Sequence, residues 1–122
     1  MGKRIVTVLG ILATAFMLAI APASARTIGP GDTIYDDKPG HFYYERSCGT
    51  YYSLSITSKK AVAGKNSNSG HCAGHVWLRM MGDSLGDWSH DASSVTRTSP
   101  KGKFRYAYIK GCGDCYAYKV YP

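Results

Sequence analysis

Most of the chain after residue 40 consists of short runs in which apolar and polar positions alternate, separated by turn-forming residues. No stretch of this part has helical periodicity, whereas aromatic and β-branched residues recur at alternate positions, as in half-buried strands. The pattern predicts strands near residues 42–47, 51–57, 75–81, 93–98, 104–110 and 116–121. Five or six short strands in residues 41–122 favour an all-β domain, either a small antiparallel sandwich or a partly open barrel.

Polar and glycine-rich segments separate these predicted strands. Residues 58–70 and 82–91 have the composition of long connections. Residues 26–40 contain two prolines, three glycines and few side chains to bury, so they are predicted to form a flexible N-terminal arm. The predicted folded domain therefore covers residues 41–122.

The last two predicted strands form the best-defined local unit. Aromatic residues alternate with other residues on both sides of Gly113 and Asp114. A glycine as the first central residue of a two-residue loop fits a type II′ turn. The sequence therefore predicts a tight hairpin at the C-terminal end.

The N-terminal residues have the organisation of a secretory signal peptide. Lys3 and Arg4 precede an uncharged run at residues 5–21, and a small-residue triplet follows at residues 23–25. A membrane anchor is the alternative, but the run is shorter than the roughly 20 residues that a span needs, and no basic cluster follows it. We therefore predict that residues 1–25 are a signal peptide, and that the processed protein is secreted, extracellular and without a membrane span.

Positive charge is concentrated near the C-terminus. The chain has 15 lysines and arginines against 8 acidic residues, and two of the basic residues lie in the predicted signal peptide. Residues 97–122 contain six basic residues and a single acidic one, Asp114. A basic face at this end is therefore expected, and its partner could be an anionic glycan, nucleic acid, a lipid headgroup or an acidic protein.

All four cysteines follow the predicted signal peptide, and export would place them where disulfides persist. We predict the pairs Cys48–Cys72 and Cys112–Cys115. Residues 112–115 can form one turn, which brings its end Cα atoms within about 7 Å, a separation that a disulfide bridges. A crossed pairing of Cys48 or Cys72 with Cys112 or Cys115 is the alternative.

The cysteines and two histidines also offer a metal interpretation. His71-Cys72-x-x-His75 with Cys112-x-x-Cys115 has ligand types and spacings that could hold zinc, and the second motif could be redox-active. In an exported protein the thiols should oxidise first, and the flanks of the second motif are predicted strands rather than the helix that redox-active pairs use. We therefore expect structural disulfides, no metal site and no cofactor.

No sequence motif in the chain identifies a catalytic site. Acid–base cleavage of RNA needs a carboxylate, a histidine and phosphate-binding cations. The carboxylate could be Glu45, the histidine His75 or His90, and the cation Arg79 or Arg105. The chain lacks the His and Glu pairing of small microbial ribonucleases, has no Gly-x-Ser-x-Gly turn, and leaves no free thiol once its cysteines are paired. The expectation is a protein without enzymatic activity, and a small secreted ribonuclease is the enzymatic alternative.

Tyrosine is the other unusual feature of the composition, since ten tyrosines are more than so small a core can bury. Packing in the core and at its rim is the alternative interpretation. Exposed rings beside lysine and arginine are typical of a binding face. The predicted binding residues are Trp88, Lys103, Arg105, Tyr106, Tyr108, Lys110, Tyr116, Tyr118 and Lys119.

Three short motifs carry a resemblance to a known group of proteins. They are Cys48-Gly49-Thr50-Tyr51-Tyr52, Gly64-Lys65-Asn66 in the segment before Cys72, and Gly111-Cys112. With these motifs, residues 48–115 resemble small secreted actinobacterial proteins of the spore-associated type. The resemblance implies an extracellular, non-enzymatic protein and carries over no catalytic residue. The added CxxC pair and the basic tail depart from that pattern.

The function expected from these features is that of a secreted, non-enzymatic binding module. It would act as an adaptor or interaction subunit that recognises an extracellular protein or a cell-surface component, within a larger secreted complex. Nucleic acid is not the expected partner. A cationic antimicrobial or toxin polypeptide acting on competing cells is an alternative, although no strongly amphipathic helix is predicted.

Overall fold

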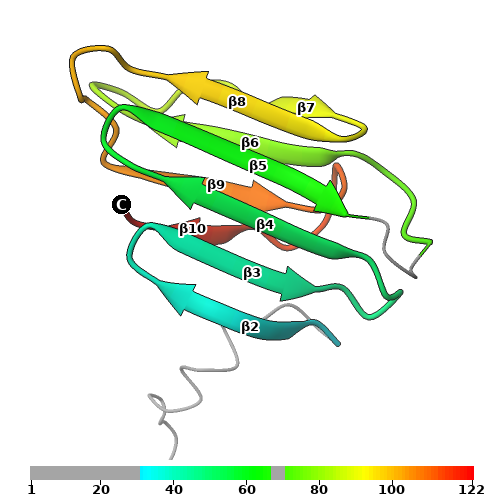
Figure 1. The fold of residues 1–122 in the computed structure, drawn as a ribbon. Helices are drawn as coiled ribbons and strands as arrows, with labels where there is room; N and C mark the ends of the chain where they lie inside the picture. Colours follow the sequence, from blue (N-terminus) through cyan, green and yellow to red (C-terminus); the bar gives the residue numbers. More distant parts are fainter. Residues whose placement is uncertain (1–30, 67–70) are drawn as a thin grey trace, which may run out of the picture.

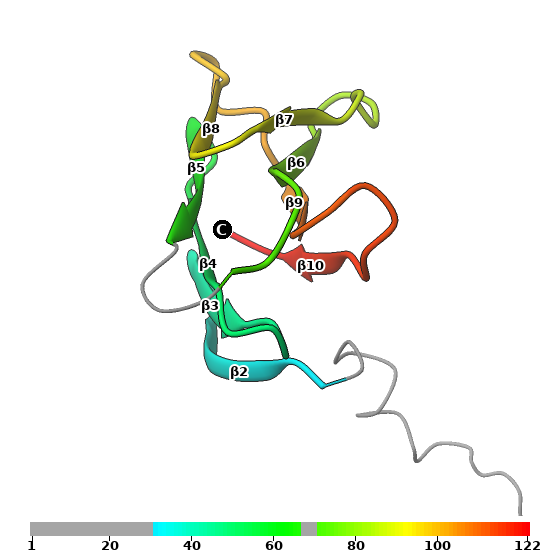
Figure 2. The same ribbon diagram turned by 90° about the vertical axis from the view of Figure 1, so that its right-hand side faces the viewer.

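The protein is a two-layered β-sandwich (Figures 1 and 2). The computed structural model describes residues 31–66 and 71–122, and the predicted signal peptide, residues 1–25, lies outside them. Within the described part, every regular element is a strand. The strands are β2 (Thr33–Lys38), β3 (His41–Glu45), β4 (Tyr51–Ile56), β5 (Lys60–Asn66), β6 (Val76–Met81), β7 (Ser89–Asp91), β8 (Ser94–Thr98), β9 (Tyr106–Lys110) and β10 (Tyr118–Val120). The all-β, antiparallel prediction is confirmed.

The two sheets differ in size. One has five strands in the order β2-β3-β4-β5-β8, and the other has four in the order β10-β9-β6-β7. All neighbouring strands are antiparallel. Figure 2 shows the sheets edge-on as two layers. None of the described residues belongs to a helix that could span a membrane.

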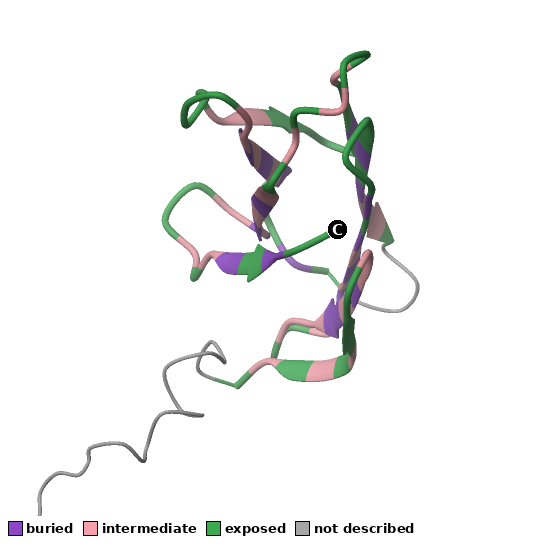
Figure 3. Cartoon of the chain, turned by 90° about the vertical axis from the view of Figure 1, so that its left-hand side faces the viewer, coloured by how far each residue is buried: buried purple, intermediate pink, exposed green. Residues whose placement is uncertain are grey.

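Alternation along the strands produces a single core between the sheets. Strand β6 buries Val76, Leu78 and Met80, and β4 buries every second residue in the same way. Figure 3 shows buried positions alternating with less buried ones along strands of both layers. Such alternation is what a sheet with one face on a core and one in water requires. The core consists of Phe42, Tyr44, Tyr52, Leu54, Ile56, Ala61, Ala63, Val76, Leu78, Met80, Val95, Ala107, Ile109, Tyr118 and Val120.

Tyrosine fills a large share of this core. The Tyr44 ring lies 5.3 Å from that of Tyr52 and 4.7 Å from that of Tyr118, measured between ring centroids. Burial raises the pKa of Tyr44, whose hydroxyl has no hydrogen-bond partner among the described residues. The packing interpretation of the tyrosines is therefore correct for these three.

Three strands were not predicted. Residues 33–38 were expected in a flexible arm, but they form β2 and pair with β3, so that prediction is wrong for them. Residues 60–66 were expected in a connection, but they form β5, whose fully buried positions are Ala61 and Ala63, and alanine is depleted in strands. Strand β7 has three residues, which are too few to show an alternation of apolar and polar positions.

The C-terminal unit also differs from its prediction. Strands β9 and β10 pair with Tyr118 opposite Ile109, so residues 111–117 form a longer connection rather than a two-residue loop. The predicted type II′ hairpin is therefore wrong. A separate turn lies inside the connection, where the backbone amide of Cys115 donates to the carbonyl of Cys112 at 3.2 Å.

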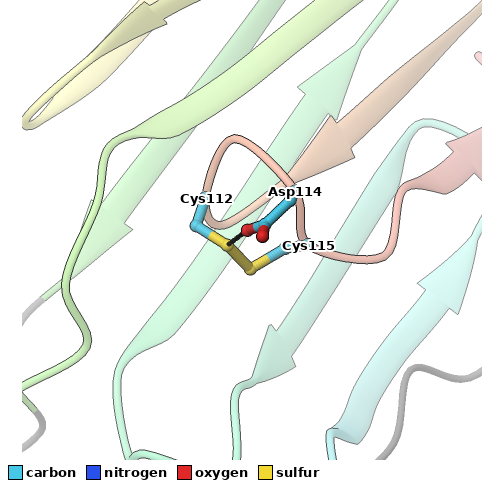
Figure 4. A group of neighbouring side chains, drawn as sticks. All are labelled: Cys112, Asp114 and Cys115. Atoms are coloured by element: carbon cyan, nitrogen blue, oxygen red, sulfur yellow. Dashed lines mark hydrogen bonds between the residues drawn. A yellow bond between two sulfur atoms is a disulfide. The ribbon is translucent and has the colours of Figure 1, made fainter.

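Both predicted disulfides are confirmed. Cys48 and Cys72 join the β3–β4 turn to the segment before β6, with their Cα atoms 5.4 Å apart. Cys112 and Cys115 close the turn between β9 and β10, with Cα atoms 5.0 Å apart (Figure 4). Disulfides of this kind are typical of extracellular proteins.

Polar contacts tie the two sheets together along both sides. On one side, the hydroxyl of Tyr118 donates to Asp32 at 2.7 Å. On the other, Arg97 donates to the hydroxyl of Ser89 at 2.6 Å. These bonds fix the relative position of the sheets, and thus the side chains on their outer faces.

Candidate binding face

The outward side of the four-stranded sheet carries rings and cations. Because Val76, Leu78, Ala107 and Ile109 point into the core, their neighbours along β6 and β9 point outward. Side chains from β7, β10, the β6–β7 connection and the residue after β10 join them. We call this surface the aromatic–basic face; it consists of Trp77, Arg79, Trp88, His90, Tyr106, Tyr108, Lys110, Lys119 and Tyr121.

One half of the face is built around two tryptophans. Strand pairing places Trp77 opposite both His90 and Lys110. The rings of Trp77 and His90 stack with centroids 3.9 Å apart, and Trp88 meets Trp77 edge-on at 6.4 Å. The ammonium of Lys110 lies 4.2 Å from the centroid of Trp88 and 5.1 Å from that of Trp77. The guanidinium of Arg79 lies 5.6 Å from the Trp88 ring.

The other half is built around tyrosines. Tyr108 lies 6.5 Å from Trp88 and 5.6 Å from Tyr106, measured between centroids, so the ring contacts continue from one half to the other. Tyr106 also lies 5.6 Å from Tyr121. The ammonium of Lys119 lies 4.1 Å from the Tyr106 ring, and a hydrogen bond with Tyr121 is the main reason why the pKa of Lys119 is raised. The result is one surface on which rings and cations alternate.

Backbone carbonyls hold the cations in place. Arg79 Nε donates to the carbonyl of Gly86 at 2.6 Å, and Lys110 Nζ donates to that of Gly113 at 2.6 Å. The Gly86 amide donates in turn to Met80, which folds the β6–β7 connection back against its own strand. The face is therefore arranged before any partner arrives, which reduces the entropy that binding loses.

The cations of the face form no ion pair with the acidic residues that the structure describes. The ion pairs within residues 31–66 and 71–122 are Lys38–Asp36, His41–Asp36 and Lys103–Asp83. None of them involves Arg79, Lys110 or Lys119. A cation–π contact leaves the charge of the cation in place, so the face is cationic as well as aromatic.

The structure brings together five of the nine predicted binding residues. Trp88, Tyr106, Tyr108, Lys110 and Lys119 share the aromatic–basic face.

The other four predicted residues lie elsewhere. Lys103 pairs with Asp83 at 3.7 Å, and Arg105 is exposed just before β9. Tyr116 borders a groove of about 200 Å³ between β10 and the β2–β3 region. Tyr118 is only 3 % exposed, and its predicted place on an exposed face is wrong because its ring lies between the sheets.

Sequence reasoning missed four members of the face, namely Trp77, Arg79, His90 and Tyr121. Alternation along β6 does indicate that Trp77 and Arg79 share the outer side. Their position beside Lys110 depends on the pairing of β6 with β9, for which the sequence has no local signal.

A second aromatic cluster lies on the opposite side of the sandwich. Tyr35, Tyr43 and Tyr51 occupy the outer side of the five-stranded sheet, with ring centroids 5.4 to 5.9 Å apart. Here the nearby charge is negative, because the Tyr35 hydroxyl donates to Glu45 at 3.0 Å. We call this surface the tyrosine cluster, and it provides a control for tests of the aromatic–basic face.

The contact between Tyr35 and Glu45 predicts an altered titration. The hydrogen bond to Glu45, followed by the repulsion of its charge, raises the pKa of Tyr35 to about 12. We expect Glu45→Ala to return this pKa toward 10, as followed by the Tyr35 ring signals in NMR spectra. A folded-state pKa above the unfolded one means that the contribution of Tyr35 to stability is present below pH 10 and is lost as the pH rises through 12. An unchanged Tyr35 titration in the variant would contradict the contact.

The disulfides remove the zinc interpretation of the cysteines. Cys112, Asp114 and Cys115 have ligand atoms within 4.8 Å of one another (Figure 4), but the two sulfurs are bonded to each other and offer no thiolate. Cys72 is likewise bonded to Cys48.

The residues suggested for ribonuclease chemistry lie in different parts of the fold. Glu45 belongs to the five-stranded sheet, where it accepts the Tyr35 bond. His75 precedes β6 and His90 lies in β7, and their Nδ1 atoms are 2.9 Å apart. The histidines therefore face each other rather than Glu45.

Comparisons of the chain with protein-family models, curated proteins and solved structures gave no match. The resemblance to spore-associated proteins stays a hypothesis, and function has to be inferred from the geometry.

Proposed function

We propose that this protein is a binding module without catalytic activity, which acts outside the cell and recognises an anionic component of a cell surface through the aromatic–basic face. The observation that carries the proposal is the array of partly exposed rings and cations on the outer side of one sheet, in which Arg79, Lys110 and Lys119 form no ion pair within residues 31–66 and 71–122. The two disulfides and the N-terminal signal pattern support an extracellular location.

The cations support an anionic partner. An anion that approaches Arg79, Lys110 or Lys119 gains attraction without breaking an existing ion pair. The interaction of each cation with its ring is worth only about 0.5–2 kcal/mol, so the cation can contact an anion and the ring together. Positive faces also speed the encounter with anionic ligands.

The rings favour a glycan-like polymer over a protein. Sugar rings have apolar C–H faces that pack on aromatic rings, and anionic groups between the sugars would meet the cations. Lysine is depleted in protein–protein interfaces, whereas Lys110 and Lys119 both lie at the centre of ring contacts here. An extended polymer also suits a surface that continues across β6, β9 and β10 without enclosing its ligand.

Removal of one ring and one cation should abolish most binding. We expect the double variant Trp88→Ala/Lys110→Ala to bind isolated cell envelopes about 30-fold more weakly, because a buried aromatic anchor contributes roughly 2 kcal/mol. Co-sedimentation with the envelopes measures the change. The matched control is Tyr35→Ala in the tyrosine cluster, which should bind like the wild type. Equal binding by the double variant and the wild type would contradict the proposal.

The chemistry of the partner is tested with the wild-type protein. Envelopes stripped of their anionic polymers should bind far less, and binding should weaken with salt, because the screening length falls from about 10 Å at 0.1 M to about 3 Å at 1 M. Retention on stripped envelopes through a protein component would instead support the adaptor hypothesis. Cleavage of RNA or inhibition of growth by the purified protein would support the ribonuclease or antimicrobial alternative.

A further inference from the structure

Two exposed histidines at one end of the aromatic–basic face, His75 and His90, share a hydrogen bond between their Nδ1 atoms. His75 precedes β6 and His90 lies in β7, and their Nδ1 atoms are 2.9 Å apart. Both side chains are exposed, so a solute can reach the two nitrogens. The strand pairing of β6 with β7 brings the residues together across 15 positions of sequence.

The separation of the two nitrogens matches a right angle at a metal ion. Two nitrogens bound at about 2.0 Å lie about 2.8 Å apart when the angle at the metal is 90°, and about 3.3 Å apart at a tetrahedral angle. The observed 2.9 Å, which is the length of the hydrogen bond that the two rings share, is close to the first value. Right angles between ligands are typical of tetragonal Cu²⁺, which also has the highest affinity for imidazole among the common divalent first-row metals.

The surroundings hold the pair in this position. The His90 ring stacks on Trp77 at 3.9 Å with an interplanar angle of 24°, which fixes its orientation. Asp91, the residue after His90, adds a carboxylate close by, which accepts hydrogen bonds from the amides of Ser93 and Ser94. Fixed ligands and a nearby carboxylate both favour a bound cation.

We propose that His75 and His90 form a site for Cu²⁺, in which their Nδ1 atoms occupy two neighbouring positions and water occupies the others. The site differs from the cysteine-containing zinc site considered from the sequence, since it uses no sulfur. The proposed envelope binding is argued from the rings and from Arg79, Lys110 and Lys119, whereas the copper site uses the two imidazoles, so Trp88→Ala/Lys110→Ala should keep its copper site.

Trp77 provides the measurement. Copper bound to His90 would lie beside the stacked indole and quench its fluorescence, so titration with Cu²⁺ yields an affinity. The full chain is produced without a polyhistidine tag, and electron paramagnetic resonance reports nitrogen ligands independently of fluorescence. We expect one copper per protein, a signal from two imidazole nitrogens, reversal by EDTA, and weaker binding of zinc.

Variants identify the ligands. His75→Gln and His90→Gln should each weaken copper binding about tenfold or more, since loss of a ligand costs at least as much as loss of an outer partner. His71→Gln, which changes another exposed histidine, should leave the affinity unchanged. All three positions are exposed, so the thermal stability of the variants should stay close to that of the wild type. Unchanged copper binding in the His75→Gln/His90→Gln double variant, or tighter binding of zinc than copper, would overturn the assignment.

Discussion

Tyr118→Ala should lose about 4 kcal/mol of unfolding free energy, a large part of what a domain of this size has. Tyr118 is buried between the sheets, and its ring lies 5.1 Å from Phe42 and 4.7 Å from Tyr44. Truncation leaves a ring-sized cavity and also removes the hydrogen bond from the hydroxyl to Asp32. Urea unfolding followed by tyrosine fluorescence measures the loss.

Tyr118→Phe separates the role of the ring from that of the hydroxyl. This variant keeps the ring and loses the bond from the hydroxyl to Asp32, so we expect a cost of roughly 1–2 kcal/mol and unchanged envelope binding. Tyr118→Ala should bind normally as well under conditions where it remains folded. A loss below about 1 kcal/mol in Tyr118→Ala would contradict the burial of this residue, as would a binding defect in Tyr118→Phe.

Removal of the Cys48–Cys72 disulfide should have the second-largest effect. Its two cysteines are 24 positions apart, and closing a loop of that length restricts the unfolded chain by about 3 kcal/mol. The connection also joins the β3–β4 turn to the segment before β6, where the Cys72 amide donates to the buried hydroxyl of Thr50 at 2.9 Å. We expect Cys48→Ser/Cys72→Ser to unfold at a clearly lower temperature in calorimetry.

The second disulfide is the matched control. Cys112 and Cys115 are three positions apart, so their removal should cost only about 2 kcal/mol by the same relation. Equal losses in the two double-serine variants would contradict the account that loop length determines the contribution of each bridge.

The sequence alone predicts those strands whose inward residues are large and apolar. Strands β4, β6 and β9 alternate clearly, since their inward positions include Leu54, Leu78 and Ile109. Strand β5 buries Ala61 and Ala63 instead, because tyrosine rings occupy much of the same core. Alanine and lysine are both depleted in strands, so β-propensity did not predict β5. Packing against the rest of the core determines this strand.

Pairing between distant strands explains what was missed in the candidate site. Composition indicated a face of rings and cations, and five predicted residues do share one. Trp77 meets Lys110 only because β6 pairs with β9, and it meets His90 only because β6 also pairs with β7. The misplacement of Tyr118 has a different cause. The ten tyrosines divide between core and surface according to the inward or outward position of each, which composition does not determine.

The most direct test of the proposed function is NMR mapping of the protein as soluble anionic envelope fragments are added. The account predicts that the indole N–H signals of Trp77 and Trp88 shift together with the amides of β6 and β9. The amides around Tyr43 and Tyr51 on the opposite sheet should stay in place. Shifts confined to the tyrosine cluster, or no shifts with fragments that compete for envelope binding, would contradict the assignment of the binding surface.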